Sequence, residues 1–153
     1  MSSSLYYVTL DEINTIMPEI MDSGFVGSID YSDIHSEDEY LNAMGTIFRF
    51  PLFDGQTGHS WNGYFDWMTD LFWENDDEWM QITKKGYNLI IYNCDTNGYA
   101  DRYDDLLKKI IDSFVYDILP WWDKDIANHV VKGEPKSFNV YLVSPQQPPK
   151  LEI

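Results

Sequence analysis

Basic residues and cysteine are both scarce in this chain of 153 residues. It has 10 lysines and arginines against 26 aspartates and glutamates, which gives a formal net charge of −16. Binding to a nucleic-acid backbone requires a surplus of positive charge, so the composition argues against a nucleic-acid partner. The single cysteine, Cys94, rules out an internal disulfide. Because it lies in an apolar run, we expect it to be a small buried residue.

Long apolar segments and targeting signals are also missing. No apolar run approaches the length needed to span a membrane. The first residues, M-S-S-S, lead into a mixed segment rather than the basic and apolar regions of a signal peptide. We therefore expect cytoplasmic residence and no membrane partner.

The patterns that accompany catalysis, phosphate binding or metal binding are not found either. The three histidines are far apart: His35, His59 and His129. They do not have the spacing of zinc ligands, either with each other or with Cys94. The run D-T-N-G-Y-A-D at residues 95–101 fails as a calcium loop, because its glycine is at the fourth position and leucine is at the twelfth. Without a nucleophile elbow or a glycine-rich nucleotide motif, the sequence assigns no catalytic residue, metal or cofactor.

What the chain does contain is ample apolar and aromatic material. Hydrophobic residues make up 44% and aromatic residues 16% of the sequence, which suffices for one domain over residues 1–153. Some of these aromatics are in excess of what a core needs, and surface tryptophan and tyrosine are typical of interfaces. An acidic surface attracts a basic partner and steers its association, although solubility alone would also explain the charge.

Short apolar runs separated by helical patterns predict an α/β domain of two or three layers, with a parallel sheet of roughly three strands. The strand candidates are residues 25–30, 87–94 and 138–143, with a further short one at 5–10. Helices are expected at residues 11–22 (capped by Asp11 and interrupted by Pro18), 36–49, 60–73, 79–83, 101–118 and 121–131 (opened by Pro120).

The most informative segment is S-W-N-G-Y-F-D-W-M-T-D-L-F-W, residues 60–73. On a helix, its apolar side chains gather on one side: Trp61, Tyr64, Phe65, Met68, Leu71 and Phe72. A neighbouring side carries a stripe of four residues spaced one turn apart: Asn62, Asp66, Thr69 and Trp73. Such a stripe is typical of a recognition surface, and a solvated helix face would give the same pattern.

The run W-N-G-Y-F-D-W-M-T-D-L also resembles the second-helix signature of barstar-like ribonuclease inhibitors, roughly N-W-D-A-L-x-D-C-L-T-D-L. Asp66 and Thr69 match that pattern, whereas Asn62 stands where the family usually has a second aspartate. Gly63 replaces an alanine and Trp67 a cysteine. The preceding polar helix start H-S-E-D-E-Y-L-N-A-M and the run F-R-F-P, within residues 35–51, extend the resemblance.

This resemblance implies a barstar-like core over residues 25–143, with an N-terminal extension at 1–24 and a Pro-rich tail at 144–153. It further implies a non-enzymatic immunity protein that plugs the active site of a basic nuclease toxin, a ribonuclease. Asp66 would enter the cleft, Asn62 and Thr69 would add hydrogen bonds, and Trp73 or Tyr64 would add apolar contact. His59, in the loop before the helix, could complete this surface.

Two other functions stay open from the sequence. One is an immunity or adaptor protein of another family that binds a non-nuclease partner. The other is a small hydrolase that uses acidic residues. A hydrolase should have a concave site with two carboxylates of unequal pKa, whereas an inhibitor should present a convex acidic stripe.

Overall fold

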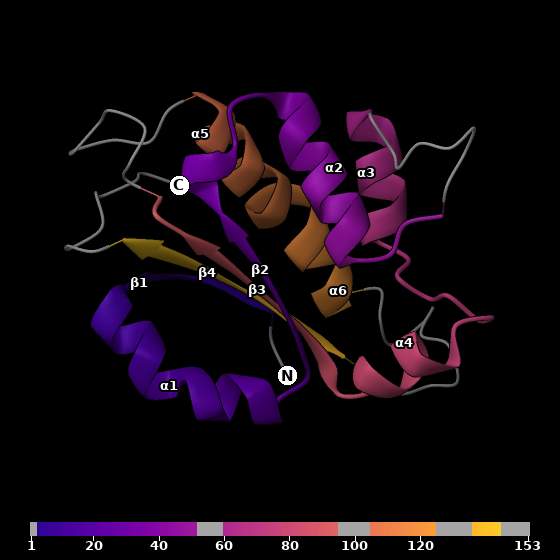
Figure 1. Ribbon diagram of the computed structural model, residues 1–153. Coiled ribbons are helices and arrows are strands. Elements are labelled where there is room, and N and C mark those ends of the chain that lie inside the picture. The colour runs from indigo at the N-terminus through magenta and orange to yellow at the C-terminus, as the bar shows by residue number, and fades with distance from the viewer. Residues whose placement is uncertain (1–2, 52–59, 95–104, 125–135, 145–153) are drawn as a thin grey trace.

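A sheet of four parallel strands forms the centre of the computed structural model, which describes residues 3–51, 60–94, 105–124 and 136–144 (Figure 1). The strands are β1 (Ser4–Thr9), β2 (Phe25–Asp30), β3 (Gly86–Tyr92) and β4 (Ser137–Ser144), and their order in the sheet is β1-β4-β3-β2. The parallel α/β architecture expected from the sequence is confirmed. The expected count of roughly three strands is corrected to four, because β1 pairs with β4 along its whole length, from Ser4 with Asn139 to Thr9 with Ser144.

Helices cover both faces of this sheet, but unequally. They are α1 (Leu10–Asp22), α2 (Glu37–Ile47), α3 (Trp61–Met68), α4 (Asp77–Ile82), α5 (Asp105–Asp112) and α6 (Leu119–Lys124), with a 3-10 turn η1 (Tyr31–Asp33) and a π-helical segment η2 (Ser113–Ile118). Figure 1 shows α1 alone on one face and α2, α3, α5 and α6 on the other. The segment expected as an N-terminal extension, residues 1–24, thus supplies both an edge strand and the helix of the thinner layer.

The alternation of side chains along the strands builds a separate core on each face. In β3, Leu89 and Ile91 belong to the large core beneath α2, α3 and α5, whereas Ile90 faces α1. The large core is rich in aromatic rings that contact one another: Phe138 stacks on Phe48 and Tyr87, and Trp79 meets Phe48 edge to face. Both faces of β3 are buried, as its uninterrupted apolar sequence predicts for an inner strand.

Two proline-based boundaries differ from expectation. α1 runs through Pro18, and its N-cap is Thr9 rather than Asp11, since the Thr9 hydroxyl and the Glu12 carboxylate form a reciprocal capping box. Pro120 does not open a new helix, because residues 105–124 are helical throughout. A proline ring clashes with the carbonyl four residues earlier in a regular α-helix. The residue four positions before Pro120 is Tyr116, which lies in the wider π-helical turn of η2. Of the helices in the described ranges, none combines the length and apolar character required to cross a membrane.

Candidate functional site

α3 carries the first half of the stripe predicted from the sequence, and its buried side fixes its position. The Ser60 hydroxyl caps the helix by accepting the Gly63 N–H at 3.0 Å. Tyr64 and Met68 are fully buried. The Tyr64 hydroxyl lies 2.7 Å from the Tyr40 hydroxyl of α2 and 2.9 Å from the Ser113 hydroxyl of η2. A buried chain of hydroxyl groups therefore locks α3 between its two neighbouring helices.

Asn62 and Asp66 are exposed on the opposite side of this helix, one turn apart. Within the described residues, neither side chain forms a hydrogen bond or an ion pair. A carboxylate and an amide that form no polar side-chain contact with a described residue thus lie one turn apart on this helix. This pair is the part of the expected stripe that the structure brings together.

The lower half of the stripe departs from expectation, because α3 ends at Met68 rather than at residue 73. Thr69 is half-buried at the C-cap, and its hydroxyl donates to the Phe65 carbonyl at 2.8 Å. Leu71 then adopts a left-handed conformation with φ of 55°. Two buried indoles hold the terminal carbonyls: Trp122 donates to Met68 at 2.9 Å, and Trp79 donates to Leu71 at 2.9 Å.

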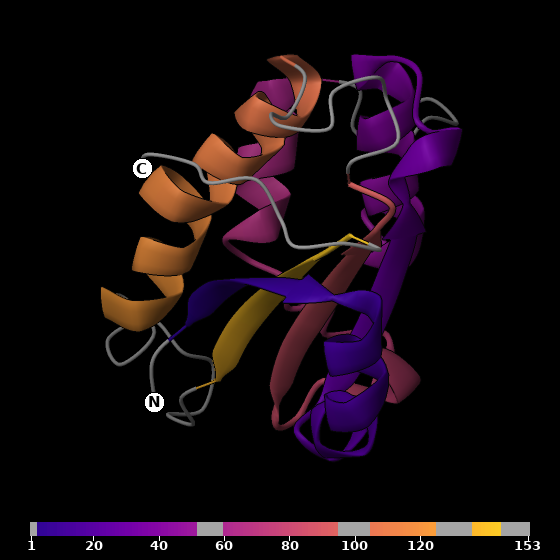
Figure 2. The same cartoon turned by 90° about the vertical axis from the view of Figure 1, so that its left-hand side faces the viewer.

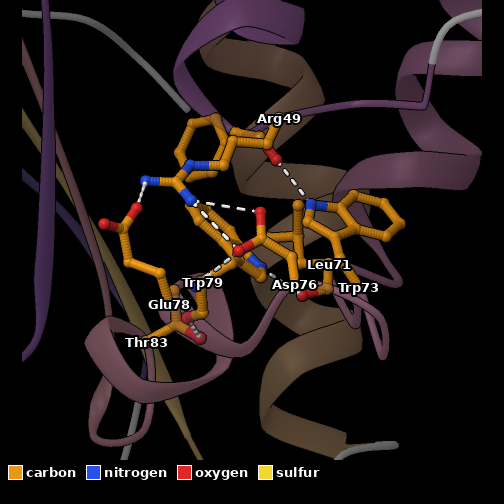
Figure 3. A network of polar contacts seen from close by, with 8 residues as sticks. Arg49, Leu71, Trp73, Asp76, Glu78, Trp79 and Thr83 are labelled. Atoms are coloured by element: carbon orange, nitrogen blue, oxygen red, sulfur yellow. Dashed lines mark hydrogen bonds and ion pairs between the residues drawn. The ribbon is translucent and has the colours of Figure 1, made fainter.

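Two expected contact residues are therefore placed differently. Tyr64 belongs entirely to the core, so its expected role as an apolar contact for a partner is wrong. Trp73 lies beyond the helix, half-buried, and its indole N–H donates to the Phe48 carbonyl at 2.7 Å (Figure 3). His59 and the Pro-rich tail at 145–153 lie outside the described residues.

A hollow of about 480 Å³ opens beside the end of α3, and it was not predicted from the sequence. Its lining comes from three separate segments: Arg49, Pro51, Trp67, Asp70, Phe72, Trp73, Glu74, Asn75 and Asp76. The rings of Trp67 and Trp73 meet edge to face, with centroids 5.5 Å apart. We name this feature the tryptophan hollow. Only the spacing of two tryptophans among acidic residues hints at it, and nothing in the sequence brings Arg49 to the same place.

One wall of the hollow is an arginine clamp between α2 and α4. Arg49 follows α2 in a left-handed conformation (φ 57°), a position that usually takes glycine. Its guanidinium donates to both oxygens of Asp76 at 3.1 and 3.3 Å and to Glu78 at 2.6 Å, and it lies 5.4 Å from the centroid of the Trp79 ring (Figure 3). Asp76 also caps α4 by accepting the Trp79 N–H at 2.9 Å. The backbone strain at Arg49 is thus offset by charge-assisted contacts to another helix.

Two acidic groups of the hollow, Asp76 and Asp70, have pKa values shifted in opposite directions. The hydrogen bond from the Trp79 N–H, followed by the Arg49 guanidinium, lowers the pKa of Asp76. Partial burial raises the pKa of Asp70, and the hydrogen bond that its carboxylate accepts from the Phe72 N–H opposes this only in part. Asp70 forms no ion pair within the described part of the chain.

The Asp76 contacts predict a specific response to acid. Because folding lowers the pKa of Asp76 from its ordinary value of 3.8, the ionised group stabilises the folded state above that value, and the gain is lost as pH falls through the folded-state pKa. We expect the free energy of unfolding in urea to fall less steeply between about pH 5 and about pH 2 in Asp76→Asn than in the wild type. Asp77→Asn, which removes an exposed carboxylate from the same helix, is the matched control. Identical slopes for Asp76→Asn and the wild type would contradict this role.

Metal chemistry receives no support from the described ranges, where no three histidine, cysteine, aspartate or glutamate side chains are grouped so as to hold an ion. Comparisons with models of protein families, with curated proteins and with solved structures gave no match. The functional argument therefore rests on the geometry of α3 and of the tryptophan hollow.

Proposed function

We propose that this chain is a non-enzymatic, cytoplasmic immunity protein that binds a basic nuclease toxin, a ribonuclease, through the exposed side of α3. In this proposal residues 25–143 correspond to a barstar-like core, and β1 and α1 are an addition to it. The observation that carries the proposal is the pair Asn62 and Asp66, exposed and without partners within the described residues on a helix whose other side is locked into the core.

The chemistry of this pair suits a cationic cleft. The Asp66 carboxylate would accept hydrogen bonds from arginine, lysine or protonated histidine side chains that normally hold the RNA phosphate, and such charge-assisted bonds are stronger than neutral ones. Asn62 would contribute a neutral hydrogen bond beside it. The Thr69 hydroxyl already donates to a backbone carbonyl, so it would act towards a partner as an acceptor only.

The direct test is an inhibition assay with the nuclease encoded beside this protein's gene. We expect an equimolar amount of the protein to block cleavage of a fluorescent RNA substrate by forming a stoichiometric complex. A nuclease that remains fully active in the presence of excess protein, with no complex detectable by calorimetry, would overturn the proposal.

The net charge of −16 predicts that association depends strongly on salt. Screening at physiological ionic strength weakens interactions beyond about 8 Å, and electrostatic steering acts mainly on the association rate. In stopped-flow measurements, the association rate constant should fall by about tenfold or more from low to high salt, while the dissociation rate constant changes less. An association rate that stays flat over this range would contradict a basic partner and favour the alternative of an adaptor for another kind of protein.

One observation favours the hydrolase alternative. Asp70 and Asp76 line the same hollow, and their pKa values are shifted in opposite directions, as in an acid–base pair. Asp76, however, already accepts hydrogen bonds from Arg49 and from the Trp79 N–H, so it is not free to activate a water molecule. Hydrolysis of RNA or of a simple ester by the purified protein, abolished in Asp70→Asn, would support the enzyme over the inhibitor.

A further inference from the structure

We propose that the tryptophan hollow is a second contact site, which takes an arginine side chain of the protein partner between Trp67, Trp73 and Asp70. The proposal rests on the proposed function only in assigning this arginine to the nuclease. The site itself is argued from the aromatic walls, the charge balance and a comparable arrangement elsewhere in the same molecule.

The aromatic walls of the hollow are already ordered. Trp67 and Trp73 are both half-buried, and their edge-to-face contact fixes the rings relative to one another. The indole N–H of Trp73 is occupied by the Phe48 carbonyl, so this ring cannot rotate freely. A ligand would therefore find two ring systems in place and would lose little affinity to the ordering of side chains.

The charges around the hollow favour a cation. Three carboxylates line it, those of Asp70, Glu74 and Asp76, against the single guanidinium of Arg49. Arg49 is already shared between Asp76 and Glu78. Asp70 and Glu74 are both exposed and form no salt bridge with another described residue, so their carboxylates are accessible to a cation. A cation placed beside Asp70 would stabilise the ionised carboxylate and so oppose the upward shift of its pKa.

The geometry points to arginine rather than lysine. A planar guanidinium can lie over an aromatic ring while it donates to a carboxylate, whereas an ammonium group is compact and strongly hydrated. The molecule already holds one arginine in this way, because Arg49 lies over the Trp79 ring while it donates to Asp76 and Glu78. The tryptophan hollow offers the same combination of ring and carboxylate next to this clamp.

The position of the hollow also fits a partner seated on α3. Trp67 directly follows Asp66 in the helix, so the hollow begins where the exposed acidic side of α3 ends. One basic surface could therefore place a first cation on Asp66 and a second in the hollow, which links the two sites without a rearrangement of the chain.

The test uses N-acetyl-arginine amide as a probe and follows the indole N–H signals of the ¹⁵N-labelled protein by NMR. We expect saturable shifts of the Trp67 and Trp73 signals, with the Trp79 signal unchanged because that ring is fully buried. The citrulline amide, which has nearly the same shape but no charge, should bind at least about tenfold more weakly, and the lysine amide should be intermediate.

Variants of the protein test whether the shifts of the indole N–H signals arise from binding in the tryptophan hollow. Trp67→Leu and Asp70→Asn should each weaken arginine amide binding by about tenfold, whereas Glu19→Gln, an exposed change on α1, should leave it unaltered. The Trp79 indole signal verifies that each variant is folded. Equal shifts with the arginine and citrulline amides, no shift at all, or unchanged binding in both hollow variants would each overturn the proposal.

The same measurements separate this site from the proposed function. Asp66→Ala should not alter binding of the arginine amide, although it should weaken the nuclease complex. If the protein binds the arginine amide but not the nuclease, the arginine site is supported and the proposed function is contradicted. If the protein binds the nuclease tightly but the hollow does not bind the arginine amide, the proposed function is supported and the arginine site is contradicted.

Discussion

Asp66→Ala should weaken binding to the nuclease proposed as the partner by at least about 2 kcal/mol, or about thirtyfold in the dissociation constant, the usual threshold for a hot spot. The cationic groups of the cleft would lose their anion and would stay desolvated and unpaired in the complex. The fold should be nearly unaffected, with a change in unfolding free energy within about 0.5 kcal/mol, because the Asp66 side chain is exposed and makes no hydrogen bond to another described residue.

Calorimetric titration of each variant against the nuclease, beside thermal melts, checks this expectation. Asn62→Ala should cost less affinity than Asp66→Ala, since a neutral amide forms weaker hydrogen bonds than a carboxylate. Glu19→Gln is the matched control, because Glu19 is an exposed acid on α1, on the other face of the sheet. If Asp66→Ala binds as the wild type does while melting normally, α3 is not the inhibitory surface.

The largest effect on stability is expected at Trp79. Its side chain is fully buried, packs edge to face against Phe25 and Phe48, and donates to the Leu71 carbonyl. Trp79→Ala should destabilise the fold by about 3–5 kcal/mol through loss of buried apolar surface and the cavity left behind. Removal of the indole also leaves the Leu71 carbonyl with less hydrogen bonding at the end of α3.

Trp79→Phe separates these two contributions in denaturant titrations. This variant keeps a ring but loses the N–H donor, so it should cost less than Trp79→Ala and still disturb the end of α3. That disturbance should appear as faster amide hydrogen exchange at Asp70 and Leu71, whose N–H groups donate to the Trp67 carbonyl. A Trp79→Ala variant as stable as the wild type would show that the ring network contributes little to the fold.

The strands were the features most readily predicted from the sequence. Residues 25–30 form β2 as predicted, and the runs at 87–94 and 138–143 overlap β3 and β4 to within two residues at each end. These strands can be recognised from local sequence, because a buried parallel strand needs consecutive apolar residues. The pairing of β1 with β4 has no such signal, since it joins residues 135 positions apart.

The end of α3 could not be predicted for a related reason. The apolar periodicity of Leu71 and Phe72 predicts that the helix continues to these residues. In the structure, however, the Leu71 carbonyl accepts a hydrogen bond from the Trp79 indole, and the backbone at Leu71 is left-handed. That contact depends on where α4 packs. The exposed pair Asn62 and Asp66 was predictable, because both lie in the regular part of the helix. Trp73 and the tryptophan hollow were not, because they follow the irregular turn and meet Arg49 from a distant segment.

The placement of β1 has a consequence for how the chain is made. β1 is synthesised before the other described strands, yet its only neighbour in the described sheet is β4, the last of them. The two lie side by side in Figure 2. During translation, β2 and β3 can pair early, but β1 must wait until β4 has left the ribosome. Contacts over such a sequence distance slow folding, because the intervening chain must first be closed into a loop. Completion of the sheet is therefore expected to be a late step in folding, after β2 and β3 have paired.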